Sequence, residues 1–210
     1  RSEKIRKVNF YGTKKIVHLA ETHKVEKVIF VSSIDAILFE NPYSKSKVDS
    51  ERELRKSKLS WVIVRPSVMF GKGDTKNFFI LNKIVRTLPI IPMPFNGNFL
   101  WQPVCVDDVA IFIANLLKDN SVVNDAINLI GPNDLTFCEI ISIIEKMNNT
   151  RRIKFPVSPA ITTFLIKLLS LLIGVQRTND IFSSFSTKIV SSSETHTIRL
   201  STKLNNILLD

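Results

Sequence analysis

The chain has 210 residues, enough for one domain with a sizeable core, and its 44% hydrophobic and 23% charged residues are ordinary for a globular protein. Its net charge of +10 is spread along the chain without a basic patch interleaved with aromatics, which argues against a nucleic-acid-binding protein. Cys105 and Cys138 lack metal-ligand spacing and are interpreted as buried thiols, so we predict no metal site and a cytoplasmic location.

The first predicted element is a helix over residues 3–23, because apolar residues such as Val8, Ile16 and Leu19 recur near helical spacing. A short β-branched and aromatic run then predicts a strand over residues 27–32, followed by a loop over residues 35–42.

A polar helix over residues 43–56 should follow this loop, with Pro42 in its first turn. Tyr43 and Lys47 are four residues apart and share one helix face, while Ser32 and Ser33 lie where the strand ends. A hydroxyl, a phenol and an ammonium can therefore converge, which is the material of acid–base chemistry on a carbonyl or alcohol. Tyr11 and Lys15 repeat the spacing, but no strand precedes them, and we interpret Tyr11 as a structural residue.

A buried strand over residues 59–64 should stop at Arg65-Pro66, because proline cannot donate a hydrogen bond inside a sheet. The next predictions are a helix over residues 77–88, an irregular Pro-rich loop over residues 89–99 and a short strand over residues 100–106. Asp107 or Asp108 is predicted to cap a helix over residues 109–117, rather than to act in catalysis.

The last sheet strand is predicted at residues 126–130, closed by Gly131-Pro132. Thr136 and Glu139 have capping-box spacing before a helix over residues 137–147. Further predictions are a strand over residues 151–157, an apolar helix over residues 160–175 and a short amphipathic piece over residues 200–209. The apolar helix is too short and broken for a membrane span and is interpreted as a core helix, with an interfacial helix as the alternative.

Several motifs occur in a recognisable order: VNFYGT, VSS, PYSKSK, WVIVRPSVMFG, QPVCVDDVA and NLIGPNDLT. Together they resemble the extended and atypical short-chain dehydrogenase/reductase superfamily, from about Lys7 to Ser186. The later part is similar to a branch that holds the accessory NADPH-binding subunit of respiratory complex I. This resemblance implies an α/β fold with a Rossmann-like doubly wound parallel sheet and a small α+β substrate lobe.

The resemblance also implies a domain plan. Residues 1–135 would form the C-terminal part of an NAD(P)-binding domain, with residues 75–105 contributing to the substrate lobe and residues 136–210 forming a mostly helical lobe for substrate or partner. No Gly-x-x-Gly-x-x-Gly turn occurs in the chain, and such a turn cradles the dinucleotide phosphates. We therefore expect that turn, with the first strands, in a segment preceding Arg1, so that this chain is a fragment.

Carried over from the family, Ser33, Tyr43 and Lys47 would be catalytic. Tyr43 would be the acid–base, Lys47 would lower its pKa and bind the nicotinamide ribose, and Ser33 would hold the reacting oxygen. The cofactor, NAD or NADP, would meet Ser32, Tyr43, Lys47, Pro66, Ser67 and Val68. For Asn9, a place beside the active site and a plain helix-surface amide are equally good interpretations.

The leading hypothesis is an NAD(P)-dependent epimerase, dehydratase or reductase acting on a sugar nucleotide or a similar small molecule. The first alternative is a non-catalytic NAD(P)-binding assembly protein associated with a membrane or a protein complex. The second alternative is an inactive fragment whose exposed sheet edge favours association. For the oligomeric state, a homodimer is one expectation.

Overall fold

A computed structural model describes residues 2–38, 40–75, 77–165 and 196–202. The chain divides into two compact units. Unit 1 comprises Arg1–Ser67, Asp107–Ile130 and Val190–Leu200, and unit 2 comprises Val68–Val106, Gly131–Ile189 and Ser201–Asp210. That unit 2 is a substrate or partner lobe stays a prediction.

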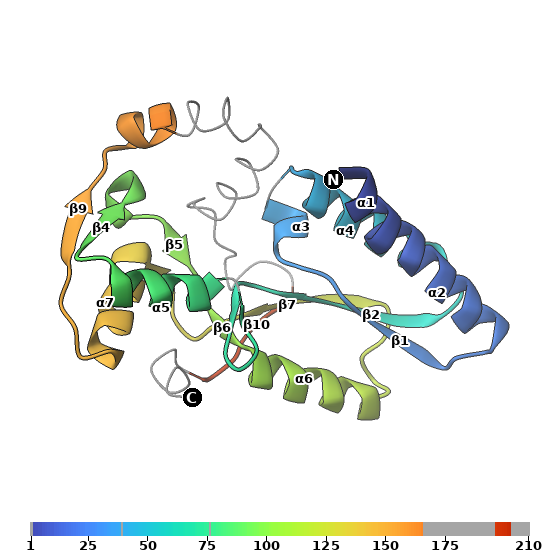
Figure 1. Ribbon diagram of the computed structural model, residues 1–210. Helices are drawn as coiled ribbons and strands as arrows, with labels where there is room; N and C mark the ends of the chain where they lie inside the picture. Colours follow the sequence, from blue (N-terminus) through green and yellow to red (C-terminus); the bar gives the residue numbers. More distant parts are fainter. Residues whose placement is uncertain (1, 39, 76, 166–195, 203–210) are drawn as a thin grey trace. The chain divides into compact units, whose positions relative to one another are not determined.

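Unit 1 is built on a parallel sheet in the order β1-β2-β7-β10 (Figure 1). Its strands are β1 (Lys27–Val31), β2 (Ser60–Pro66), β7 (Asp125–Ile130) and β10 (Thr197–Arg199). All three pairings are parallel, so the carboxyl ends of the strands meet at one edge, as the α/β prediction requires.

Helices cover both faces of this sheet (Figure 1). They are α1 (Ser2–Arg6), the π-helical turn η1 (Lys7–Tyr11), α2 (Gly12–Thr22), α3 (Asp35–Leu38), α4 (Pro42–Lys56) and α6 (Val106–Lys118). Val17 of α2 and Leu54 of α4 pack on Trp61 and Ile63 of β2, which alternation places on one face. On the other face, Lys27 of β1 donates to the carbonyl oxygens of Leu116 and Asp119, where α6 ends.

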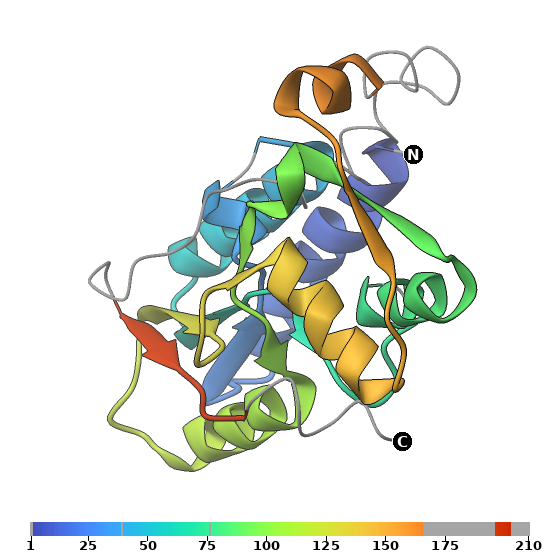
Figure 2. The same cartoon turned by 90° about the vertical axis from the view of Figure 1, so that its left-hand side faces the viewer.

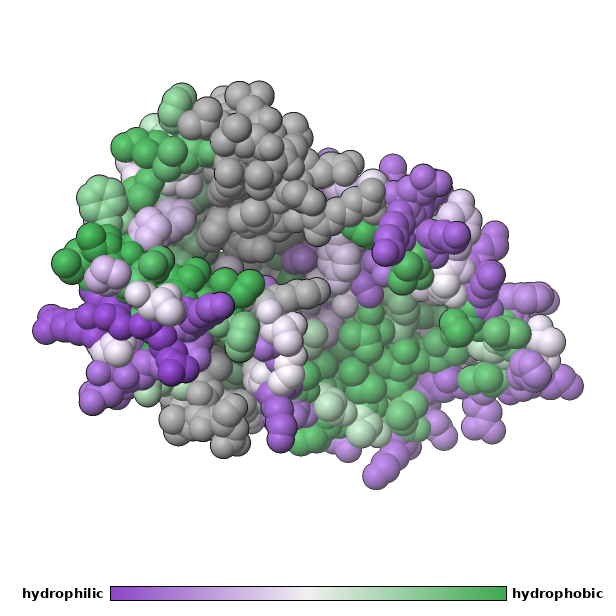
Figure 3. Space-filling model, viewed as in Figure 1, coloured by the Kyte–Doolittle hydropathy of each residue, from purple (hydrophilic) through white to green (hydrophobic). Residues whose placement is uncertain are grey.

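β1 pairs with β2 only, among the strands that the structure describes. Val31 at its end is 41% exposed, and Figure 3 shows apolar surface where Figure 1 draws β1 and β2. A parallel strand with one free edge and apolar side chains is a surface that another strand can complete.

The described residues of unit 2 form short strands and helices around an apolar core. Its elements are β3 (Met69–Phe70), α5 (Asn77–Thr87), β4 (Ile90–Met93), the 3₁₀ turn η2 (Pro94–Gly97), β5 (Leu100–Trp101), β6 (Val104–Cys105), β8 (Leu135–Thr136), α7 (Phe137–Met147) and β9 (Ile153–Pro156). They make three two-stranded sheets, β3-β6, β4-β9 and β5-β8; Figure 2 shows β4 and β9 side by side.

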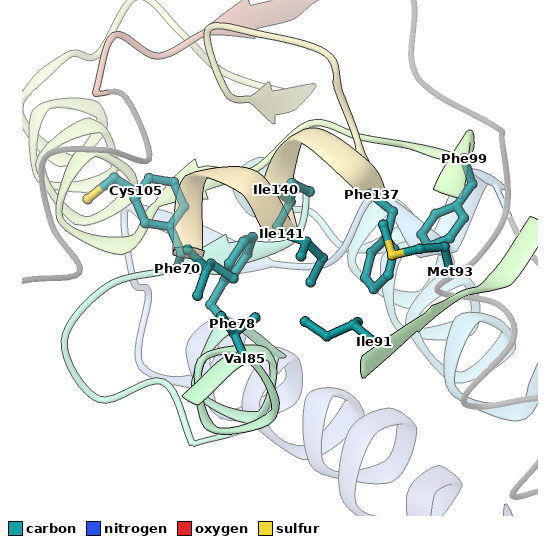
Figure 4. Close-up of a cluster of buried hydrophobic side chains, with 11 residues drawn as sticks. Phe70, Phe78, Val85, Ile91, Met93, Phe99, Cys105, Phe137, Ile140 and Ile141 are labelled. Carbon is teal, nitrogen blue, oxygen red and sulfur yellow. The ribbon is translucent and has the colours of Figure 1, made fainter. Parts of the chain in front are cut away.

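The core of unit 2 gathers aromatic and aliphatic side chains from α5, α7 and the short strands (Figure 4). Phe78 is fully buried and meets Phe70 and Trp101 edge-on, at centroid distances of 5.7 and 5.9 Å. Gly131 comes so close to the Pro103 carbonyl that a Cβ would lie 1.7 Å from its oxygen, so only glycine fits there.

Several local predictions were confirmed. The helix over residues 3–23 is continuous through α1, η1 and α2, and α4 begins at Pro42 as expected. Thr136 and Glu139 form the complete capping box of α7. Cys105 is buried, and neither Cys105 nor Cys138 is in a disulfide.

Other boundaries were wrong. The loop over residues 35–42 contains α3, and β2 continues through Pro66, which faces Leu129 in the ladder. The Pro-rich segment over residues 89–99 holds β4 and η2. The strand over residues 126–130 is not the last one of the sheet, because β10 follows it along the chain and pairs with β7. α6 begins at Val106, so Asp107 and Asp108 lie inside its first turn and not at its cap. Carboxylates in a first turn interact favourably with the helix dipole.

Residues 159–165 are helical, and the rest of the predicted 160–175 helix lies outside the described residues. Most of the predicted amphipathic piece over residues 200–209 also lies outside them. Among the helices that the structure describes, none has both the length and the apolar character needed to cross a membrane.

Candidate active site at the end of the first strand

Two elements of unit 1 carry the candidate site: the end of β1 and the first turns of α4 (Figure 1). Asn41 caps α4, its side chain accepting a hydrogen bond from the Ser44 backbone N–H at 2.9 Å. This cap and the proline at the next position fix where the helix begins, and hence where Tyr43 emerges.

The structure brings the three predicted catalytic residues together. The Ser33 hydroxyl acts on the Tyr43 phenol and lowers its pKa, so these two side chains lie close together. The Lys47 ammonium donates to the Val31 carbonyl oxygen at 2.9 Å and lies 5.9 Å from the centre of the Tyr43 ring. The same ammonium lies 5.1 Å from the centre of the Phe30 ring. A hydroxyl, a phenol and an ammonium therefore share the carboxyl end of β1.

Asp35 is a fourth polar group at this place, and sequence reasoning missed it. Its backbone N–H donates to Ser33 Oγ at 3.3 Å, and its carboxylate acts on the Tyr43 phenol. Burial raises the pKa of the Asp35 carboxyl, and its hydrogen bond with Ser33 partly opposes that rise. The sequence signal was a carboxylate two residues after the predicted strand-end serine.

The pKa of Tyr43 is raised above its ordinary value, first by burial and then by the charge of Asp35, while the Ser33 hydrogen bond lowers it. Among the causes that act on this pKa in the described structure, Lys47 does not appear, and its role in lowering the pKa with cofactor bound stays a prediction. Burial also lowers the pKa of Lys47, opposed by the charge of Glu51. The resting site therefore holds a neutral phenol, which can donate a proton but does not readily accept one.

The predicted cofactor-binding residues outside the Ser33, Tyr43 and Lys47 group have different neighbours. The Ser32 hydroxyl donates to Glu51 Oε1 at 2.6 Å and is buried. The Pro66 carbonyl accepts from the Ile34 N–H at 3.0 Å, and the Ser67 N–H donates to the Leu129 carbonyl at 2.9 Å. Val68 belongs to unit 2, where it packs against the apolar core. Their contact with a cofactor stays a prediction.

Asn9 has a structural partner. Its side-chain amide donates to Ser46 Oγ at 2.9 Å, and its backbone carbonyl oxygen accepts a hydrogen bond from Ser50 Oγ at 3.2 Å. Both serines lie on α4, so the π-helical turn η1 is tied to the helix that carries Tyr43. Tyr11 is about half exposed and packs against Phe10 with a centroid distance of 5.1 Å, consistent with a structural role.

The residues present fit one half of a dinucleotide. Hydroxyl and ammonium groups at a strand end suit the nicotinamide ribose and a reacting oxygen. A glycine-rich phosphate cradle, by contrast, does not occur in the sequence.

The comparisons with known proteins agree with this reading. Residues 2–120 match a family described as NAD(P)H-binding. The mouse protein named NADH dehydrogenase [ubiquinone] 1 alpha subcomplex subunit 9, mitochondrial, is 30% identical over 149 residues, which are 70% of this chain and 39% of that protein. UDP-glucose 4-epimerase of Vibrio cholerae is 31% identical over 112 residues, covering 44% of this chain and 34% of the enzyme.

Solved structures show the same fold. UDP-glucose 4-epimerase from Thermotoga maritima, with UDP-glucose, matches with a TM-score of 0.63 at 19% identity, covering 76% of this chain and 59% of the enzyme. UDP-glucuronic acid 4-epimerase from Bacillus cereus, in complex with NAD, matches with a TM-score of 0.62 at 18% identity, covering 72% and 56%. The chain thus spans well under two thirds of the length of these proteins.

The family match covers more than half of the chain, and it confirms the predicted Rossmann-like fold and the cofactor class, NAD or NADP. The chain belongs to the NAD(P)H-binding family, with relatives among complex I subunits and nucleotide-sugar epimerases.

Proposed function

We propose that the protein binds NAD(P)(H) at the end of β1 and transfers hydride to or from a hydroxyl or carbonyl substrate of the nucleotide-sugar class. The observation that carries the proposal is the convergence of Ser33, Tyr43 and Lys47 at the end of β1. The Lys47 ammonium donates to the Val31 carbonyl and lies 5.9 Å from the centre of the Tyr43 ring, and Ser33 acts on the Tyr43 phenol. The sugar-nucleotide class comes from the epimerase relatives. When bound, the nicotinamide ring supplies the hydride chemistry.

In this proposal the chain's own residues handle the proton. In the reducing direction, the neutral Tyr43 phenol gives its proton to the substrate carbonyl oxygen, which the Ser33 hydroxyl holds in place. In the oxidising direction, Tyr43 must first become phenolate, and positive charge beside it is required because burial and Asp35 both oppose ionisation. Lys47 supplies part of that charge and offers two further N–H donors to ribose hydroxyls.

The test uses the full gene product and Tyr43→Phe. We expect the variant to bind NADH about as tightly as wild type by fluorescence titration, while turnover of UDP-sugars falls at least a hundredfold, as loss of an acid–base group does. Tyr11→Phe is the matched control and should keep its activity. Undiminished turnover by Tyr43→Phe would remove Tyr43 from the mechanism.

The second candidate is a nicotinamide-binding subunit of a membrane-associated complex that performs no turnover. The similarity to the mouse complex I subunit over 70% of this chain favours it, as does the raised pKa of Tyr43. NADH binding without turnover of any UDP-sugar, together with co-purification with a membrane complex, would select this candidate. A cytoplasmic location fits the first candidate, whereas the second, whose mouse relative is named mitochondrial, would place the protein at a membrane.

A further inference from the structure

A carboxylate is buried beneath the candidate site. The Glu51 side chain on α4 is 6% exposed. It accepts the Ser32 hydroxyl at 2.6 Å and two N–H groups of Arg65, at 2.8 Å from Nε and 2.5 Å from Nη2. Arg55 Nη2 lies 3.9 Å from the same carboxylate. Acidic side chains are almost never this buried unless paired, so the site is built around the pairing.

Stability alone does not account for such a pair. The cost of removing both charges from water is comparable with their mutual attraction, and apolar replacements of buried pairs are often equally stable. The elements that the Glu51–Arg65 pair connects point instead to a role in fixing the geometry of the site.

Glu51 connects the two elements that carry the candidate site, β1 and α4, with the neighbouring strand β2. Ser32 directly precedes Ser33 at the end of β1, and Arg65 directly precedes Pro66 at the end of β2. Lys47 is one helical turn before Glu51, on the same face of α4. The backbone continues the link, with the Ser32 N–H on the Val64 carbonyl at 2.7 Å.

Glu51 also acts on the charge of Lys47. Burial lowers the pKa of the ammonium, and the Glu51 carboxylate raises it. The other charged or titratable groups around these two are Tyr43 and Arg55 on α4, Asp35 on α3 and Arg65 on β2. Among the groups that act on Lys47 in the described structure, Glu51 is the one whose charge favours the protonated ammonium.

We propose that Glu51 is a positioning residue: it locks Ser32 and Arg65 at the two strand ends and places its carboxylate one helical turn from Lys47, whose ammonium would meet the nicotinamide ribose. The cofactor part of this inference rests on the proposed function, and the part concerning Lys47 does not. Glu51 itself does not touch the reacting atoms.

The first test concerns Lys47 in the protein without cofactor. The rate of Lys47 acylation by an amine-selective reagent is followed from pH 6 to 11 by peptide mass spectrometry, with the exposed Lys45 as internal reference. Glu51→Gln should shift the midpoint for Lys47 to lower pH and leave Lys45 unchanged. Glu53→Gln is the matched control, because Glu53 lies on the same helix and its ion-pair partner among the described residues is Lys14, at 4.0 Å. An unshifted Lys47 midpoint in folded Glu51→Gln overturns the inference.

The second test is NADH affinity as a function of pH. In Glu51→Gln the alkaline loss of binding should begin at lower pH than in wild type or Glu53→Gln. If wild type binds no NADH at any pH, the proposed function fails, and the acylation midpoints still decide whether Glu51 sets the charge of Lys47.

Ser32→Ala decides the matter if Glu51→Gln does not fold, since it leaves the Glu51–Arg65 pair in place. It should retain the wild-type Lys47 midpoint and bind NADH several-fold more weakly, because Ser33 loses its fixed neighbour. Wild-type NADH affinity in Ser32→Ala would count against the positioning role.

Discussion

The core of unit 2 and the end of β1 in unit 1 bury different kinds of group. Unit 2 buries rings and branched aliphatic side chains such as Phe78, Phe137 and Ile140. At the end of β1, unit 1 buries Ser32 and Glu51 and partly buries Tyr43 and Lys47, whose pKa values shift against ionisation. An apolar core lowers the free energy of the folded state, whereas buried titratable groups cost free energy and are expected where chemistry requires them. Substitutions should therefore cost stability in unit 2 and function at the end of β1.

The largest effect is expected from Phe78→Ala in unit 2. Phe78 is fully buried between Phe70 and Trp101, so truncation should lower the free energy of unfolding by about 3–5 kcal/mol. Urea unfolding followed by Trp101 fluorescence in a Trp61→Phe background reports on this unit, because Trp61 belongs to unit 1. Phe79→Ala is the control, since Phe79 is 54% exposed. Equal losses for both variants would contradict this account of the core.

A smaller loss is expected at the start of α7. Thr136 accepts the Glu139 N–H at 3.2 Å, and Glu139 in return accepts the Thr136 N–H at 2.7 Å. Thr136→Ala should cost about 1 kcal/mol, the usual value of an N-cap, in the same urea assay. Thr136→Ser, which keeps the hydroxyl, should recover most of that loss.

How far the sequence predicts this structure depends on how local each signal is. The Thr136–Glu139 capping box and the start of α4 at Pro42 are signalled by their neighbours, and they were predicted closely. β4 was missed because it is a strand only through its pairing with β9, far along the chain, and three-residue β10 lies in a polar stretch.

The site shows the same division. Ser33, Tyr43 and Lys47 were predicted from their spacing. Glu51 and Arg65 were missed, because charged side chains ordinarily lie in water. One signal was available: Tyr43, Lys47 and Glu51 follow one another at four-residue intervals, so they share a helix face, and Arg65 directly follows the apolar run Trp61–Val64.

Lys47→Met sharpens the comparison, because its expected effect on stability is small. The folded-state pKa of Lys47 lies below the unfolded value, so the unfolded chain binds more protons between the two, and this group's contribution to stability rises with pH there. At pH 7 the substitution relieves that cost and loses the Val31 hydrogen bond, worth about 1 kcal/mol. The net change should stay within about 1 kcal/mol by urea unfolding, while NADH affinity is lost. A destabilisation as large as that of Phe78→Ala would place Lys47 with the structural residues.

Asp35→Asn should change a pKa with little effect on stability. Removing the carboxylate charge should lower the pKa of Tyr43, measured as tyrosinate absorbance at about 295 nm in a Tyr11→Phe background, where Tyr43 is the only tyrosine. Glu40→Gln is the charge-matched comparison and should leave the titration unchanged. Identical titrations for Asp35→Asn and its parent would remove Asp35 from the site.

The most direct test of the central claim is the same absorbance recorded while NAD⁺ is added to the full gene product at about pH 9, below the ordinary tyrosine pKa. If the positively charged nicotinamide binds beside Tyr43, tyrosinate absorbance rises in wild type and in Tyr11→Phe but not in Tyr43→Phe. If NAD⁺ binds and the absorbance stays constant, or rises equally in Tyr43→Phe, the nicotinamide does not lie beside Tyr43 and the proposed site is wrong.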